Sequence, residues 1–134
     1  MPAFLHLVTL REGLKCSVHD GRHNLLAAEA KVIRLVPGQT AVTGALNCMP
    51  REGFDSYVHI HRVVGGAVVL GRVHSRFCVE NDGLSLKQAE FHHPMTLNGR
   101  RLEKEGAVAL QENDELTIDG VVTFRVSFTE PKGG

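Results

Sequence analysis

The sequence is poor in aromatic residues: it contains no tryptophan, and Tyr57 is its single tyrosine. Few side chains are therefore available to stack on nucleic-acid bases or on sugars. Lysine and arginine together number 15, as do aspartate and glutamate, so the formal net charge at pH 7 is zero. A chain without net positive charge has no overall field that attracts nucleic acid or an acidic membrane. We expect neither of these as a partner.

Long hydrophobic runs are missing as well. No apolar stretch reaches membrane-spanning length, and the first residues lack the basic start and apolar run of a secretory signal. Cys16, Cys48 and Cys78 are an odd number of cysteines without a close pair, which is typical of reduced thiols in an intracellular protein. The sequence predicts a soluble protein of the cytoplasm or nucleus.

Short β-strands dominate what is present. The 134 residues fit one domain that buries a core without disulfides or metal. Strand-like segments, separated by turn-forming residues, cover 4–10, 14–18, 57–64, 67–73, 76–80, 84–92, 95–97, 108–111, 115–118 and 121–128. The Gly65-Gly66 pair predicts a hairpin between 57–64 and 67–73. So many short strands predict an all-β fold, either a β-sandwich or a small barrel.

A single helix is predicted, over residues 25–35. The apolar residues spaced along one helical face are Leu25, Leu26, Ala28, Val32 and Ile33. Asn24 is positioned to cap this helix, and Pro37 would end it. Residues 31–36 fit a strand equally well.

Three polar motifs follow one another among the later strands, each expected at a strand end: Gly71-Arg72, Ser85 and the Asn98-Gly99 turn. An arginine presents a planar fork to phosphate oxygens, and a serine hydroxyl helps to complete the shell. Lys87 and Arg76 would add positive charge at the rim. The series predicts a site for a phosphate and the peptide that bears it. The alternative is a solvated charge at Arg72 and a plain tight turn at Asn98.

The order and spacing of these motifs resemble a forkhead-associated (FHA) domain, the phosphothreonine-binding β-sandwich of many signalling and scaffold proteins. The resemblance spans about 57–128 and rests on VVLGR at 68–72, LSLKQA at 84–89, TLNGRRL at 96–102, LQENDELTIDG at 110–120 and VTFRVSF at 122–128. It implies an FHA-like sandwich that binds a protein partner. The processes in which FHA domains act, and which the resemblance therefore implies, include signalling and cell division. It implies no enzyme activity and no cofactor. The phosphopeptide-binding residues it implies are Arg72, Ser85, Lys87 and Asn98.

The sequence also departs from the FHA pattern. Gln88 stands where the family usually has histidine, and Leu86 where arginine often follows the serine. The stretch from Ala89 to Asn98 is too short to hold the usual peptide-gripping asparagine. A phosphate-independent docking or dimerisation domain that kept the fold is therefore an alternative function.

The expected domain organisation follows from the span of the resemblance. Residues 56–129 would form the FHA-like sandwich, and 130–134 a flexible tail. Residues 1–55 would be an N-terminal extension with at most one helix, or a first strand at 4–10 followed by an insertion. The first strand is expected beside the last, as in other sandwiches of this type.

Eight histidines raise a second alternative, a zinc-binding protein. Cys16, His19 and His23 have spacings within reach of zinc ligation, and a fourth ligand would be Cys48 or His74. No second half of a zinc motif accompanies them, and no nucleophile elbow or glycine-rich phosphate loop occurs in the sequence. We therefore predict no metal site and no catalytic residue, and keep zinc binding as the alternative.

Overall fold

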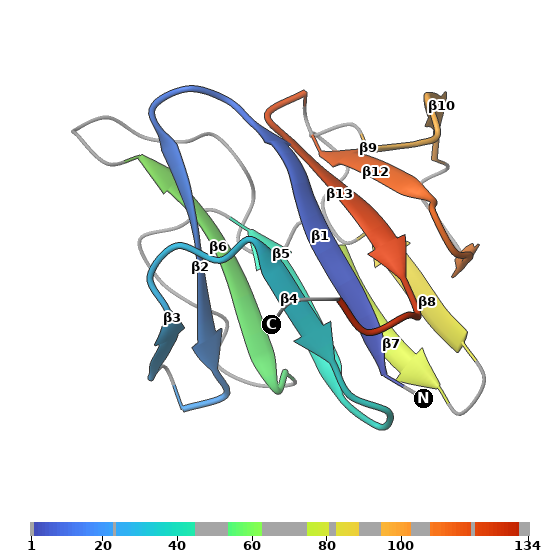
Figure 1. Ribbon diagram of the computed structural model, residues 1–134, viewed down its shortest axis with the longest axis horizontal. Coiled ribbons are helices and arrows are strands. Elements are labelled where there is room, and N and C mark those ends of the chain that lie inside the picture. Colours follow the sequence, from blue (N-terminus) through green and yellow to red (C-terminus); the bar gives the residue numbers. More distant parts are fainter. Residues whose placement is uncertain are drawn as a thin grey trace.

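The computed structural model describes residues 2–22, 24–44, 54–62, 75–80, 83–88, 95–102, 108–118 and 120–131. These residues form β-strands joined by turns, and they contain no helix (Figure 1). The strands are β1 (Ala3–Leu10), β2 (Leu14–Asp20), β3 (Leu25–Ala27), β4 (Val32–Leu35), β5 (Thr40–Gly44), β6 (Ser56–Arg62), β7 (Ser75–Glu80), β8 (Gly83–Gln88), β9 (Met95–Leu97), β10 (Arg100–Arg101), β11 (Val108–Leu110), β12 (Glu115–Ile118) and β13 (Val122–Ser127).

The strands build two sheets. Sheet A has the order β10-β9-β12-β13-β1-β4, and sheet B has the order β11-β8-β7-β5-β6-β2-β3. β5 and β6 run parallel, whereas the other described pairs are antiparallel. The predicted all-β sandwich is confirmed.

The core lies between the two sheets and is supplied by alternate residues of their strands. Leu5 in β1 and Phe124 in β13 face it from sheet A, while Ile60 in β6, Phe77 in β7 and Leu86 in β8 face it from sheet B. This spacing of two is what a strand with one buried face requires. Each of these large side chains stabilises the fold by about 1.5–3 kcal/mol through burial.

The predicted helix over 25–35 is wrong. Residues 25–27 form β3, which pairs with β2, and residues 32–35 form β4, which pairs with β1. Ile33 and Leu35 are buried while Val32 and Arg34 are exposed, so the pattern has a period of two. Pairing with β1 buries these side chains in the main core, and this tertiary gain overrides the helix-like spacing. The alternative of a strand at 31–36 is confirmed.

Residues 3–44 contribute strands to both sheets. β1 lies beside β13 in sheet A, with Phe4 opposite Ser127, which is where the first strand was expected. β5 lies inside sheet B, between β6 and β7. The predicted boundary near residue 55 therefore falls within one sandwich, because strands on both sides of it share the same sheets. The predicted Gly65-Gly66 hairpin and tail residues 132–134 lie outside the described residues.

In the part of the chain that the structure describes, no helix is long and apolar enough to span a bilayer.

Candidate functional site

One end of sheet B gathers the ends of four strands. Thr43 of β5 lies opposite Ser75 of β7, and Ser75 lies opposite Gln88 of β8. β6 runs parallel to β5 and continues past this row to Arg62. β5, β6 and β8 thus finish, and β7 begins, at the same end, which we call the Ser75 end.

Arg72, with Gly71, lies outside the described residues. The chain that contains it is attached at Arg62, where β6 finishes, and at Ser75, where β7 begins. Both attachment points are at the Ser75 end.

Lys87 lies at the Ser75 end, directly opposite Arg76 in the β7–β8 register. Like charges at directly opposite positions of an antiparallel pair destabilise it. The two residues that the sequence assigned to the rim of a phosphate site are therefore paired with each other.

Ser85 lies further along the sheet, inside β8 and not at the end of a strand. It pairs with Cys78 of β7 on one side and with Ala109 of β11 on the other. With a rise of about 3.3 Å per residue, it is about 10 Å from the Ser75 row. Its half-buried hydroxyl donates to the carbonyl oxygen of Cys78 at 3.4 Å. Ser85 and Lys87 therefore share a strand but not the same end of the sheet.

Asn98 forms the tight turn between β9 and β10, as predicted, with φ of 53° at Asn98 and 83° at Gly99. Its side-chain Nδ2 donates to Asp114 Oδ1 at 3.0 Å, and its Oδ1 accepts from the backbone N–H of Glu115 at 2.9 Å. Asp114 Oδ2 in turn accepts from the backbone N–H of Gln111 at 2.7 Å. The Asn98 amide thus fastens the turn to the start of β12 in sheet A.

Two hydroxyl residues at the Ser75 end were missed by the sequence reasoning. Thr43 is only 1% exposed although it is polar, and it lies directly opposite Ser75. Only the register of β5 against β7 brings them together. The one sequence signal for Thr43 was local: a threonine followed by Gly44 indicates the end of a β-strand.

The two described residues of the zinc alternative, Cys16 and His19, are three positions apart on β2 and therefore lie on opposite faces of the strand. Cys16 faces the core and is 2% exposed, and burial raises the pKa of its thiol to about 12, whereas zinc binds a thiolate. His19 lies three residues on, with its Nε2 3.2 Å from the Ser17 hydroxyl and its ring 5.9 Å from that of His59. His23, Cys48 and His74 lie outside the described residues. Among those described, no three histidine, cysteine, aspartate or glutamate residues are grouped to hold a metal ion.

Neither a protein-family model nor a curated protein matches this sequence. Solved structures share its fold. An FHA domain of an Arabidopsis thaliana hypothetical protein has a TM-score of 0.62 and 15% identity, over 99% of this chain and 91% of that one. The FHA domain of the CT664 protein of Chlamydia trachomatis has a TM-score of 0.59 and 15% identity, over 97% and 100%.

A third structure, the MEK1 FHA domain in complex with a phosphothreonine peptide of HOP1, has a TM-score of 0.52 and 14% identity, over 86% of this chain and 97% of that one. The resemblance drawn from the sequence motifs is thereby confirmed at the level of the fold. The chain has the fold of a divergent FHA domain, and the match includes its first strands as well as residues 57–128.

Proposed function

We propose that this protein is an interaction module that binds a phosphothreonine-containing segment of a partner protein at the Ser75 end of sheet B. The observation that carries the proposal is the direct pairing of Arg76 with Lys87 at that end. Two opposed cations favour an anionic ligand, and a phosphate carries close to two negative charges at pH 7. A phosphothreonine peptide bound to the MEK1 FHA domain supports the same ligand class for this fold.

The four residues have different parts in this proposal. Arg72 binds the phosphate through its guanidinium fork, and Lys87 adds charge from the neighbouring strand. Ser85 has the smaller part at the phosphate, because it is about 10 Å from the Ser75 row and its hydroxyl already has a partner. Asn98 contacts the peptide from the β9–β10 turn. The function is recognition, and it needs neither a cofactor nor a catalytic residue.

Calorimetric titration with a phosphothreonine peptide library, and with the same peptides unphosphorylated, tests the proposal. We expect binding of phosphorylated peptides only, and a loss of about tenfold or more in Arg72→Ala, since a charge-assisted hydrogen bond contributes roughly 1.5–3 kcal/mol. Arg125→Ala is the matched control, because Arg125 is exposed in the middle of β13 in sheet A, away from the β9–β10 turn. The absence of phosphate-dependent binding, or equal affinities of Arg72→Ala and the wild type, would contradict the proposal.

A phosphate-independent docking or dimerisation domain is the second candidate. It is favoured by the position of Ser85 inside β8, paired on both sides. Equal affinities for phosphorylated and unphosphorylated peptides would support it. Stoichiometric zinc in the purified protein would instead support the zinc-binding alternative.

A further inference from the structure

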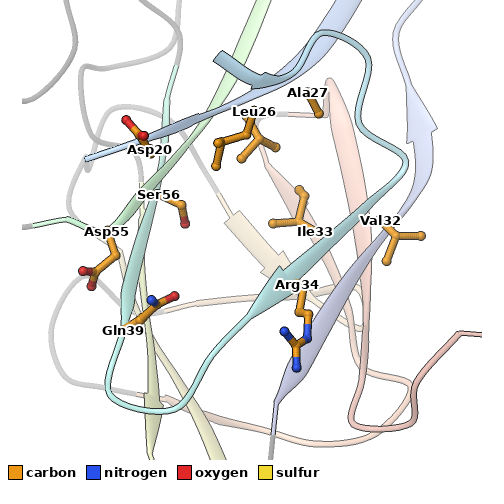
Figure 2. A pocket seen from close by; sticks show the side chains of 10 residues that line it. Asp20, Leu26, Ala27, Val32, Ile33, Arg34, Gln39, Asp55 and Ser56 are labelled. Atoms are coloured by element: carbon orange, nitrogen blue, oxygen red, sulfur yellow. The ribbon is translucent and has the colours of Figure 1, made fainter. Parts of the chain in front are cut away.

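A groove lies at the beginning of β6, whose other end belongs to the Ser75 end, and at the side of the sandwich where both described sheets end. β4 is the last strand of sheet A there, and β3 is the last strand of sheet B. The groove has a volume of about 420 Å³. Figure 2 shows Asp20, Ser56, Asp55 and Gln39 along one side of it and the residues of β4 along the other. We call it the edge groove.

The backbone of β4 offers hydrogen-bonding groups toward this side. Leu7 N–H donates to the Lys31 carbonyl at 2.8 Å, and the β1–β4 register continues from that position. In an antiparallel pair, bonded and non-bonded positions alternate. The N–H and C=O groups of Val32 and Arg34 therefore point away from β1, and both residues line the groove. A further strand could pair with them.

The groove has an apolar wall that is open to solvent. Leu26, on β3, is 61% exposed and lines the groove, and buried Ile33 lies below it on β4. Leu25, its neighbour on β3, is 58% exposed but does not line the groove. Val32 adds further exposed apolar surface on β4. Exposed apolar side chains beside a strand edge that no other described strand pairs with are characteristic of an interaction surface.

The charges of the groove favour a cation. Two carboxylates, Asp20 and Asp55, line it against one guanidinium, that of Arg34. Asp20 Oδ1 accepts from the backbone N–H groups of Arg22 and Asn24. The Asn24 hydrogen bond is the main cause that lowers the pKa of Asp20, so this carboxylate is ionised at neutral pH. Asp55 Oδ2 accepts from the backbone N–H of Thr40 at 2.8 Å.

We propose that the edge groove binds an extended segment of a partner protein, which adds to β4 as a strand. One of its apolar side chains packs on Leu26 and Ile33, and a lysine or arginine on the same face of the segment interacts with Asp20 and Asp55. The backbone pairing supplies affinity, and the alternate side chains supply specificity. This site needs no phosphate and uses none of the residues at the Ser75 end, so it goes beyond the proposed phosphopeptide function.

The probe is a capped peptide, Thr-Lys-Thr-Val-Thr-Val-Thr, which places lysine and both valines on one face when extended. We expect it to bind the full chain in calorimetric titration, and the same peptide with glutamate in place of lysine to bind about tenfold more weakly. Amide hydrogen exchange at Val32 and Arg34 should slow when the lysine peptide is added, because these N–H groups become paired. Arg72→Ala should bind it as the wild type does.

Leu26→Asp and Leu25→Asp form the decisive pair of variants. They change adjacent side chains of nearly equal exposure, of which only Leu26 lines the groove. We expect Leu26→Asp to weaken peptide binding by about tenfold or more, and Leu25→Asp by less than about twofold. Asp55→Asn keeps an oxygen for Thr40 N–H, and should weaken binding of the lysine peptide only. Melting temperatures show that the variants are folded.

Three outcomes would overturn the proposal. The first is no binding of the lysine peptide by the wild type at peptide concentrations up to about 1 mM. The second is an equal loss in Leu25→Asp and Leu26→Asp. The third is self-association of the chain that Leu26→Asp abolishes, because the occupant of the groove would then be a second copy of β4 and not a different protein.

Discussion

The β9–β10 turn and the Ser75 end of sheet B differ in what determines them. At the turn, Asn98 and Gly99 adopt positive φ, and the Asn98 side chain satisfies groups on Asp114 and Glu115. At the Ser75 end, Arg76 faces Lys87 because of the register of two strands. At the turn, the side chains of Asn98 and Asp114 are both held by hydrogen bonds within the fold. At the Ser75 end, by contrast, two basic residues occupy opposite positions of the strand register.

The largest expected effect is at the turn. Asn98→Ala removes two side-chain hydrogen bonds worth about 1 kcal/mol each and forces an alanine into the left-handed region at about 1 kcal/mol or more. We expect the free energy of unfolding, measured by urea denaturation, to fall by about 2–3 kcal/mol. Asn98→Gly is the control that removes the hydrogen bonds alone, and it should cost less than Asn98→Ala. Equal stability of Asn98→Ala and the wild type would show that the Asn98 hydrogen bonds do not stabilise the fold.

Gly99→Ala should have a smaller effect at the same turn. A Cβ built at Gly99 meets no atom within 4 Å, so the only penalty comes from its φ of 83°. That backbone conformation costs an L-residue about 1–2 kcal/mol. Gly83→Ala is the control, since it also meets no atom within 4 Å but carries no positive φ. A loss in Gly83→Ala as large as that in Gly99→Ala would refute the conformational explanation.

Acid should lower the free energy of unfolding by protonating Glu112, which lies in the connection between β11 and β12. The N–H of Phe128 donates to Glu112 Oε2 at 2.6 Å, and this bond is the main cause that lowers the pKa of Glu112 in the folded state. The stabilisation is therefore complete above the unfolded pKa of about 4.3 and is lost as the pH falls through the lower folded value. Glu112→Gln should reduce the loss of stability below that pH in urea titrations. If Glu112→Gln and the wild type lose stability equally as the pH falls, Glu112 does not contribute to the acid sensitivity.

The smallest effect is expected at the Ser75 end. Lys87→Ala should leave the free energy of unfolding unchanged or raise it by up to about 0.5 kcal/mol, because it removes the repulsion from Arg76. The difference between Lys87→Ala and the wild type should shrink when salt is raised from about 0.05 to 0.5 M, since salt screens exposed charges. Lys15→Ala is a control in which an ion pair with Glu29 is lost instead. Destabilisation by more than about 1 kcal/mol in Lys87→Ala would mean that Lys87 has a structural role.

The features that could be predicted from the sequence are those that depend on neighbouring residues. The Asn98-Gly99 turn follows from two residues that tolerate positive φ, and the alternation in 122–128 reports a strand with one buried face. These signals sufficed for an all-β sandwich and for the FHA-like motif order. They sufficed because residues only a few positions apart determine both the turn and the alternation of the strand.

The features that could not be predicted depend on pairing between distant segments. Residues 25–35 have a helix-like spacing of apolar residues. They form strands of two different sheets because β3 pairs with β2 and β4 pairs with β1. The position of Ser85 depends on its pairing with Cys78 and Ala109. The edge groove requires β3 and β4 to end their sheets on the same side, and no local pattern specifies that.

The pairing of β1 with β13 also constrains how this protein is made. Phe4 lies opposite Ser127 in the middle of sheet A, so the ribosome must synthesise nearly the whole sequence before that sheet can assemble. Until then β1 lacks the strand that pairs with it on one side. Contacts between such distant residues slow folding, and a chaperone that shields β1 during translation would protect the protein from misassembly.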